Sequence, residues 1–286
     1  MYTFYMAVYT RATHYTFSPD DTFIYSYWVV GDSAKPVLLI LSGLTGTHTD
    51  LLEITERLRD HYYIIIPDLP GWGESPRFSK RLSIRNYALY IHELLRHIKV
   101  HDFYLLGHCM GATIAIEYTT LFPKHVQKLI LVSTPYYQGA ITMLIIRWLS
   151  LLSLHAPVHF RWLFYLWRNR FFDFIASIYI LQFRSYKKKF RLARRGWEQR
   201  SLQNEESFEE NWVSLLAYRY HSLRHLEIPI LLIHGEKDRV IAPIQAGKLQ
   251  RLIPQAKLVY LEHAGHIPVM ETPQTLATLV DEFLQN

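Results

Sequence analysis

One short segment of the chain has the composition expected of a nucleophilic site. Gly107-His108-Cys109-Met110-Gly111 places the only cysteine midway between two glycines. The segment follows an apolar run, residues 103–106, and precedes a stretch with helical spacing. A residue at such a strand–turn–helix junction projects from a strained turn, so the positions two residues away on either side must lack bulk. A helix N-terminus favours a thiolate over a thiol, so we expect Cys109 to be a nucleophile. The alternative is an inert cysteine that packs as a small apolar side chain.

Two later apolar runs end in segments that can supply an acid and a base. Asp238 lies in the segment that follows residues 229–233, and His266 lies in the segment that follows residues 258–261. The carboxyl ends of parallel strands meet at one edge of a sheet, where ligands bind. We therefore expect both side chains close to Cys109.

Each of these two roles has a competitor nearby in the sequence. Glu236 is an alternative acid, although we expect it to be solvated, and His263 is an alternative base. Asp238 could also be an ordinary turn residue. Residues 132–134, where such folds can also keep the acid, contain no carboxylate, and this favours Asp238.

Four other polar residues in these segments are expected to be structural. We expect His108 and His234 to pack or hydrogen-bond near the site. We expect Asp68 and Ser75 to fix the loop in which they lie.

The elements that must position these side chains alternate between strands and helices. Short apolar runs predict buried strands at residues 24–30, 36–41, 63–66, 103–106, 128–132, 229–233 and 258–261. Helical spacing predicts helices at 84–98 with Ser83 as N-cap, at 111–122, at 244–252 and from Thr272-Pro273 onward. This alternation predicts an α/β fold with a mostly parallel sheet.

Composition narrows the class of protein. The chain has 286 residues, of which 50% are hydrophobic, so it can bury a large core without disulfides or structural metals. A single cysteine excludes an internal disulfide framework and a cysteine-built zinc site. The first 17 residues contain no basic segment followed by an apolar run, as a secretory signal would, so we expect a cytoplasmic location.

A shift in composition near residue 136 indicates an inserted module. Residues 136–200 contain 12 Lys and Arg but only 2 Asp and Glu, while the rest of the chain has an excess of acidic residues. The same stretch is rich in aromatic residues, and its apolar runs are too short and too interrupted to span a membrane.

Five segments in order resemble the motifs of the α/β-hydrolases. They are LSGLTG, DLPGWGES, GHCMGA, GEKDRVIAP and HAGHIPVMETP. Their order of nucleophile, acid and histidine is that of the family. The resemblance covers residue 20 to the C-terminus, apart from the insert. It implies an α/β-hydrolase fold, with an eight-stranded, mostly parallel sheet, a core domain of residues 1–135 and 211–286, and a helical cap at 136–210.

The resemblance also implies a role for each site residue. Cys109 would be the nucleophile, His266 the general base and Asp238 the residue that orients His266. The family pattern places the catalytic histidine after the glycine of its loop, and this favours His266 over its competitor. Backbone N–H groups of Leu44 and Met110 would hold the oxyanion.

Two further features of the motifs concern the shape of the site. Gly107 and Gly111 would be the glycines that the nucleophile elbow requires. Ser42 stands where the family usually has His, a departure expected to loosen the oxyanion loop without removing its backbone donor.

A cysteine nucleophile resembles that of dienelactone hydrolases and polyhydroxyalkanoate synthases, which use Cys-His-Asp. We therefore expect a hydrolase that cleaves an ester or thioester of a hydrophobic acid through an acyl-enzyme, with no metal or organic cofactor. The alternatives are an acyltransferase that uses the same acyl-cysteine, a serine esterase silenced by a Ser→Cys exchange, and a non-catalytic ligand-binding or membrane-associated protein.

The insert suggests which molecules the protein contacts. We expect it to line a pocket for a small hydrophobic acyl or aromatic ester substrate. Its basic residues, 187–195, could instead face an anionic membrane, as a peripheral contact, or form an ordinary solvated helix face. Nucleic acid is not expected as a partner, because no recognition motif accompanies the basic charge.

Overall fold

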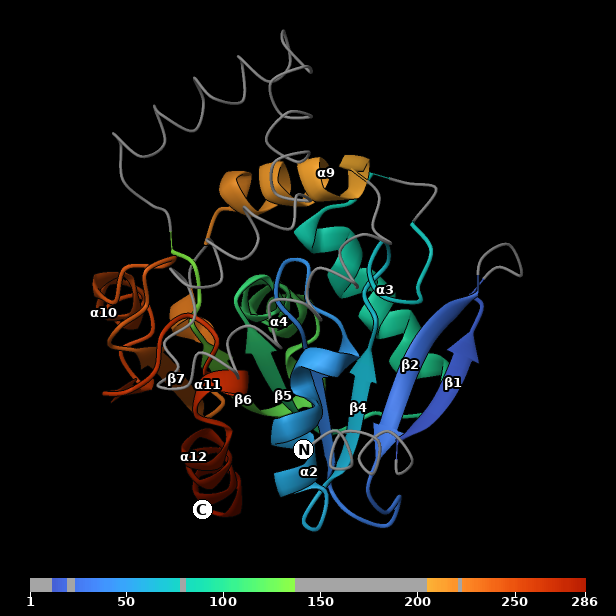
Figure 1. Ribbon diagram of the computed structural model, residues 1–286, viewed down its shortest axis with the longest axis horizontal. Helices are drawn as coiled ribbons and strands as arrows, with labels where there is room; N and C mark the ends of the chain where they lie inside the picture. The colour runs from blue at the N-terminus through green and yellow to red at the C-terminus, as the bar shows by residue number, and fades with distance from the viewer. Residues whose placement is uncertain (1–11, 20–23, 78–80, 137–204, 221–222) are drawn as a thin grey trace, which may run out of the picture.

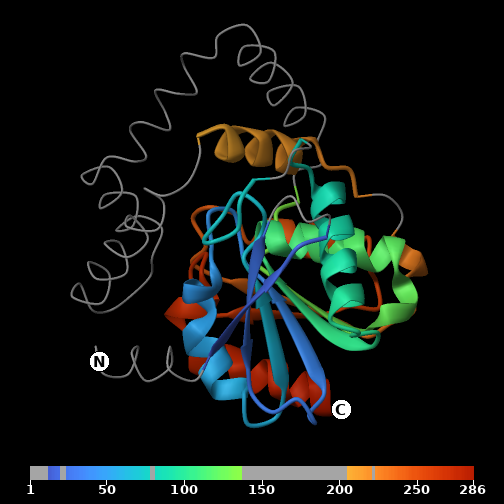
Figure 2. The ribbon, with the colours of Figure 1, turned by 90° about the vertical axis from the view of Figure 1, so that its right-hand side faces the viewer.

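The computed structural model describes residues 12–19, 24–77, 81–136, 205–220 and 223–286 (Figure 1). Most of the predicted cap, residues 136–210, therefore lies outside the described residues. The described residues form one central sheet with helices packed on both faces (Figures 1 and 2).

Eight strands form the sheet, in the order β1-β2-β4-β3-β5-β6-β7-β8. Strand β2 pairs antiparallel with β1 and with β4, and all other neighbouring strands are parallel. The strands are β1 Thr13–Phe17, β2 Tyr25–Val30, β3 Val37–Leu41, β4 Tyr63–Pro67, β5 Phe103–His108, β6 Val126–Val132, β7 Ile230–Gly235 and β8 Lys257–Leu261. This arrangement confirms the predicted eight-stranded, mostly parallel sheet.

The described helices cover both faces of this sheet. The α-helices are α2 Leu52–Leu58, α3 Ile84–His97, α4 Met110–Leu121, α9 Glu205–Ala217, α10 Ile244–Gln250, α11 Pro268–Glu271 and α12 Pro273–Gln285. Three short 3-10 helices are η1 His48–Leu51, η2 Pro123–His125 and η3 Leu223–His225. Figure 2 shows α2 and α12 on one face of the sheet and α3 and α4 on the other.

The apolar strands are buried on both faces because each contributes to two hydrophobic cores. In β3, Leu39 and Leu41 pack in the core beneath α3, α4 and α10. The alternate residues Leu38 and Ile40 pack in the core beneath α2 and α12. Alternation of this kind follows from the period-2 geometry of a strand. It explains why the central strands read as continuous apolar runs in the sequence.

Outside the insert, the helices and strands predicted from apolar patterns are all present, with ends that differ by a few residues. The apolar helices expected within the insert, at 141–154 and 171–183, lie outside the described residues. Strand β1 was not predicted, because it has no apolar run and four of its five residues are exposed. It is an edge strand whose register is set by pairing with β2, and the ring of His14 stacks on that of Trp28 at 4.6 Å. The short helices α2 and α11 were also not predicted. The side chain of Thr272, the N-cap of α12, makes no capping hydrogen bond.

Helix α9 lies over the carboxyl edge of the sheet and is tied to the start of α3 (Figure 1). Glu210 accepts a hydrogen bond from the backbone N–H of Leu82 at 2.9 Å, and Ser214 accepts one from that of Ile84 at 2.9 Å. Glu210 also pairs with Arg77 at 2.7 Å. Helix α9 includes residue 210, at which we expect the cap to end. The structure therefore shows no break in the chain at this position, and the boundary stays a prediction.

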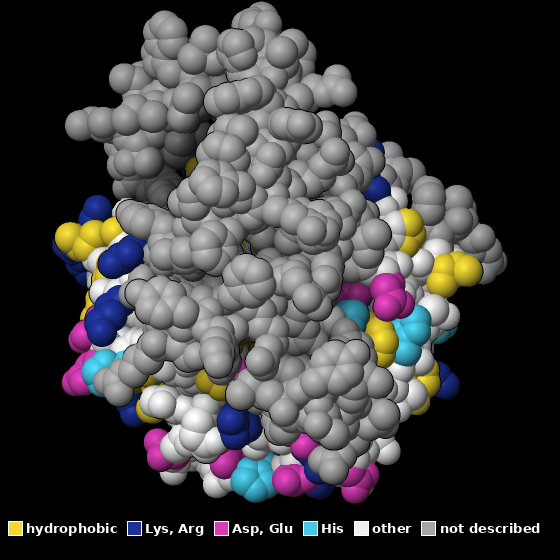
Figure 3. All heavy atoms as spheres, in the orientation of Figure 1, with side chains coloured by type: hydrophobic (Ala, Val, Ile, Leu, Met, Phe, Trp, Pro, Cys, Tyr) yellow, Lys and Arg dark blue, Asp and Glu magenta, His cyan; other side chains and the backbone are white. Residues whose placement is uncertain are grey.

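The described surface has mixed charge. Figure 3 shows acidic, basic and histidine side chains interspersed around the rim of the face seen in Figure 1. None of the helices in the described part of the chain is long and apolar enough to cross a membrane.

The N-cap of α3 provides a test of how this helix is fixed. Ser83 has an extended backbone, and its hydroxyl accepts a hydrogen bond from the N–H of Asn86 at 3.1 Å. We expect Ser83→Ala to lower the free energy of unfolding by about 1 kcal/mol, because this N–H loses its partner. Ser83→Asn, which keeps a capping oxygen, serves as the control in urea unfolding. Equal stability of the two variants would contradict the assignment of the cap.

Candidate active site

The loops that carry the predicted site residues converge at the carboxyl edge of the parallel strands. Cys109 directly follows β5 and begins α4 as its N-cap. Asp238 lies in the loop after β7, and His266 lies in the loop after β8. All three side chains are largely buried, and Cys109 is 7% exposed.

Cys109 has a strained backbone. Its φ is 51° and its ψ is −116°, in a region that residues with a side chain rarely adopt. Hydrogen bonds on both sides hold this conformation. The N–H of Cys109 donates to the carbonyl of Val132 on β6 at 2.9 Å, and its own carbonyl accepts from the N–H of Ala112 at 3.0 Å.

The two flanking glycines allow the close contacts of this turn. A Cβ added at Gly107 would lie 2.4 Å from the carbonyl oxygen of Gly111. A Cβ added at Gly111 would lie 2.4 Å from the carbonyl oxygens of Leu41 and Ser42. Backbone atoms cannot move aside as side chains do, so both positions require glycine. The structure thus places both residues as the elbow pattern predicts.

Each of the two carboxylate oxygens of Asp238 has two polar partners. One oxygen accepts from the N–H groups of Val240 and Ile241, both at 2.8 Å. The other lies 2.9 Å from Nδ1 of His266 and 3.2 Å from Nε2 of His234. Burial alone would raise the pKa of Asp238, but the bonds from the two histidines hold that pKa below its usual range. Asp238 is therefore ionised and fixes the orientation of His266.

His266 lies between the acid and the thiol. Its Nδ1 lies 2.9 Å from a carboxylate oxygen of Asp238, and the Cys109 thiol is close enough to influence the pKa of the same ring. Burial opposes protonation of this imidazole, but its interactions with Cys109 and Asp238 raise its pKa to about 10. An imidazole that interacts with both a thiol and a carboxylate can take a proton from the thiol and later protonate a leaving group.

The predicted oxyanion donors lie on the two segments that meet at Cys109. Met110 is the first residue of α4, where the backbone N–H has no partner within the helix. Leu44 follows Gly43, at which an added Cβ would lie 3.1 Å from the Cβ of Cys109. The Ser42 hydroxyl donates to the carbonyl of Gly46 at 3.0 Å. This hydrogen bond closes the loop that contains Leu44. The effect of a serine in place of the usual histidine stays a prediction.

The competing residues differ from Asp238 and His266 in burial. Glu236 and His263 are both exposed, while Asp238 and His266 are buried. We expected His108 and His234 to pack or hydrogen-bond near the site, and both do. His108 hydrogen-bonds to the backbone carbonyl of His266, and His234 hydrogen-bonds to that of Ile241. Within the described ranges, no three His, Cys, Asp or Glu side chains form a cluster that could hold a metal ion.

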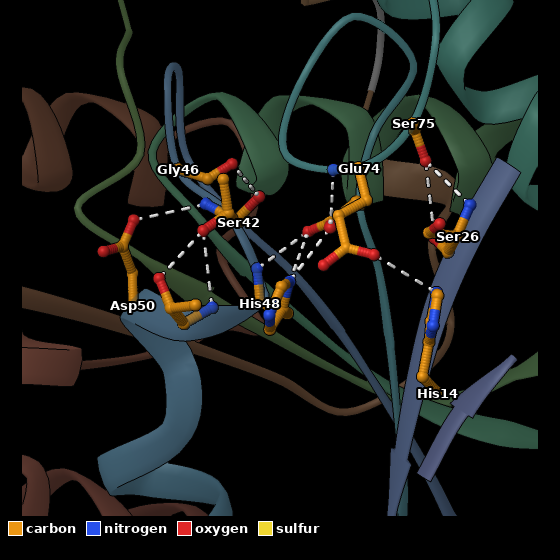
Figure 4. A network of polar contacts seen from close by, with 11 residues as sticks. His14, Ser26, Ser42, Gly46, His48, Asp50, Glu74 and Ser75 are labelled. Atoms are coloured by element: carbon orange, nitrogen blue, oxygen red, sulfur yellow. Dashed lines mark hydrogen bonds and ion pairs between the residues drawn. The ribbon is translucent and has the colours of Figure 1, made fainter. Parts of the chain in front are cut away.

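A second buried network fixes the loop after β4 (Figure 4). The Asp68 carboxylate accepts hydrogen bonds from the backbone N–H groups of His48 and Glu74, at 2.9 and 3.1 Å, and lies 2.9 Å from Nδ1 of His48. Ser75 accepts a hydrogen bond from the N–H of Ser26 at 2.9 Å. Asp68 and Ser75 therefore hold their loop, as we expected.

Sequence analysis missed two residues that shape the site. His48 holds Asp68 from a distant segment, and its ring stacks on Trp28 at 4.1 Å. Glu271 accepts hydrogen bonds from the N–H groups of Gly265 and Ile267, and so fixes the loop on which His266 lies. Only the glutamate gave a signal in the sequence, as part of the HAGHIPVMETP motif.

The α/β-hydrolase fold model matches residues 36–273, most of the chain. The chain belongs to the α/β-hydrolase fold family. This match confirms the resemblance predicted from the five motifs.

Relatives in this family include two lipases. The chain is 26% identical over 249 residues to Lipase 1 of Psychrobacter immobilis, covering 84% of this chain and 74% of the lipase. It is 24% identical over 259 residues to human monoacylglycerol lipase ABHD6, covering 87% of this chain and 75% of that protein. These relatives support the expectation that this α/β-hydrolase is an enzyme of the ester-hydrolysing kind.

Solved structures share the fold of this α/β-hydrolase. An esterase from Exiguobacterium antarcticum superposes with a TM-score of 0.79 at 16% identity, covering 95% of this chain and 99% of the esterase. A thermophilic esterase from Thermogutta terrifontis gives a TM-score of 0.76 at 19% identity, covering 96% and 98%.

The pKa of His266 tests the contact between base and thiol. In the wild type we expect this imidazole to remain protonated until the pH approaches about 10. In Cys109→Ala the pKa should fall, because the interaction with Cys109 that favours the charged ring is lost. The measurement is an NMR titration of ¹⁵N-labelled histidine, with the exposed His263 as an internal reference. The same pKa in both proteins would show that His266 and Cys109 do not interact.

Proposed function

We propose that this α/β-hydrolase cleaves an ester or thioester of a hydrophobic acid through a covalent acyl-cysteine. The observation that carries the proposal is the position of Cys109. It lies on a strained turn at the start of a helix, its thiol is close enough to His266 to influence the pKa of that imidazole, and Gly43 of the proposed oxyanion loop packs against its Cβ. The names of the two lipases support the substrate class.

The first half of the reaction acylates the cysteine. The Cys109 thiolate attacks the carbonyl carbon of the substrate, and the carbonyl oxygen becomes an oxyanion. Backbone N–H groups of Leu44 and Met110 stabilise this oxyanion. The bond to the leaving group breaks as the ring of His266 donates its Nε2 proton to the departing oxygen or sulfur. An acyl-cysteine thioester and a neutral His266 remain.

The second half of the reaction releases the acid. Neutral His266 takes a proton from a water molecule, and the resulting hydroxide attacks the thioester carbonyl. The C–S bond breaks, the acid leaves, and the thiolate and the imidazolium are restored. Asp238 stays ionised throughout and stabilises the charged ring. An alcohol in place of water would make the same acyl-cysteine an acyltransferase intermediate.

The choice of substrate rests on the sequence of residues 136–210. Their apolar and aromatic composition favours a hydrophobic acyl or aromatic group, and their basic residues are compatible with contact to a membrane surface. Both statements remain predictions, because these residues lie largely outside the described part of the chain.

Substitution of the cysteine tests the proposal directly. With a series of p-nitrophenyl esters of increasing chain length, we expect turnover and an acyl adduct in the wild type. We expect Cys109→Ala to reduce kcat/KM by at least about a thousandfold, because the nucleophile is removed. Intact-mass measurement detects the adduct, and an added alcohol distinguishes transfer from hydrolysis.

Two results would overturn this proposal. Activity that appears only in Cys109→Ser would mean that the cysteine silences a serine esterase. No turnover and no adduct in all three proteins, with every ester tested, would favour a binding protein.

The acid and the base can be tested with matched controls from their own loops. We expect Asp238→Asn to lower kcat about a hundredfold or more and His266→Ala to lower it at least about a thousandfold. Glu236→Gln and His263→Ala, both at exposed positions, should leave kcat unchanged within about twofold. A larger loss in either control than in its partner would reverse the assignment of that role.

A further inference from the structure

We propose that His108 is a positioning residue that aligns His266 and the oxyanion loop with Cys109. The inference rests on the proposed function, because it assigns a part to a residue of the same site. It goes beyond the expectation of a structural histidine, since it predicts an effect on the chemistry as well as on folding.

The first contact joins His108 to the loop of His266. Nε2 of His108 lies 2.9 Å from the backbone carbonyl oxygen of His266. A carbonyl oxygen can only accept, so Nε2 carries a proton and donates it to this bond. The bond fixes the main chain at the very residue whose side chain must reach the thiol.

The second contact joins the same ring to the oxyanion loop. A Cβ added at Gly43 would lie 3.1 Å from Nδ1 of His108 and 3.1 Å from the Cβ of Cys109. The backbone of Gly43 therefore packs directly against the imidazole and the cysteine. Leu44, whose N–H is the proposed oxyanion donor, is the next residue.

The ring of His108 is neutral in this setting. Burial and the neighbouring charge of His266 lower the pKa of His108 to about 4. The other titratable groups that act on it are Asp238 and His234. With its proton on Nε2, the neutral ring has an unprotonated Nδ1 facing the oxyanion loop. A neutral ring also places no second positive charge beside His266.

These contacts make His108 a link between strand β5 and two loops. Its backbone belongs to β5, one edge of its ring bonds the loop after β8, and the other edge packs against the loop after β3. A shift of about 1 Å in a reacting group can cost roughly a hundredfold in rate. Loss of the bond to His266 is therefore expected to weaken the pairing of thiol and imidazole.

Three substitutions separate positioning from simple packing. His108→Gln keeps an N–H donor the same number of bonds from the backbone as Nε2. His108→Asn is also polar, but its side chain is one bond too short to reach the carbonyl of His266. His108→Leu fills space without any donor. Circular dichroism and thermal unfolding of each variant report its folding.

Two readouts are measured on each variant. The first is the rate of acyl-enzyme formation from a p-nitrophenyl ester, with KM determined separately. The second is the rate at which iodoacetamide alkylates Cys109, followed against pH. Alkylation needs only the thiolate and its imidazolium partner, so it does not depend on hydrolysis.

We expect His108→Asn and His108→Leu to slow acylation roughly tenfold to a hundredfold while KM changes little. In both variants the alkylation curve should move to higher pH, because a displaced His266 stabilises the thiolate less. His108→Gln should keep both readouts within about threefold of the wild type, because its amide N–H can replace the bond from Nε2. A threefold change corresponds to a difference of under ~1 kcal/mol.

The inference is overturned if Gln and Asn behave alike, or if Leu keeps the acylation rate and alkylation curve of the wild type. If Leu does not fold, the comparison of Gln with Asn decides. If the wild type forms no acyl-enzyme, the proposed function fails. In that case the alkylation curves still decide whether His108 aligns His266 with Cys109.

Discussion

The backbone strain at Cys109 is the constraint around which the rest of the site is arranged. Cys109, a residue with a side chain, has to adopt a positive φ so that its thiol projects at the end of β5 and the chain turns directly into α4. Such strain persists only where the surroundings over-determine it. Here the parallel pairing of β5 with β6, the two flanking glycines and the close approach of the β3 loop supply that support.

The same strained turn determines how the titratable groups of the site interact. Because the turn holds the sulfur near His266, the imidazole interacts with both Cys109 and Asp238, and its charged form is stabilised although it is buried. Asp238 in turn depends on two backbone N–H groups and on His234 as well as on His266. The buried charges are thus paired and hydrogen-bonded, which is the condition for keeping them inside a protein. Glu271 fixes the loop on which His266 lies, through the N–H groups of Gly265 and Ile267.

Much of this architecture could be predicted from the sequence, for identifiable physical reasons. The central strands are buried on both faces, so they appear as apolar runs, and the glycines of the elbow are required by contacts with backbone atoms. Strand β1 could not be predicted, because its exposed residues depend on a partner strand for their conformation. The pairing of His48 with Asp68 and the bond from His108 to His266 join segments far apart in the chain. No local pattern reveals such contacts.

The central claim is that the acyl group is carried by Cys109, and the most direct test is to locate that group. The enzyme is mixed with a chromogenic ester, quenched in acid during the first turnover and digested, and the peptide that contains residue 109 is analysed by mass spectrometry. We predict the added mass of the acyl group on Cys109, removable by hydroxylamine at neutral pH as expected for a thioester. An acyl group on another residue, or an unmodified Cys109 peptide despite a burst of released alcohol, would contradict the proposed chemistry.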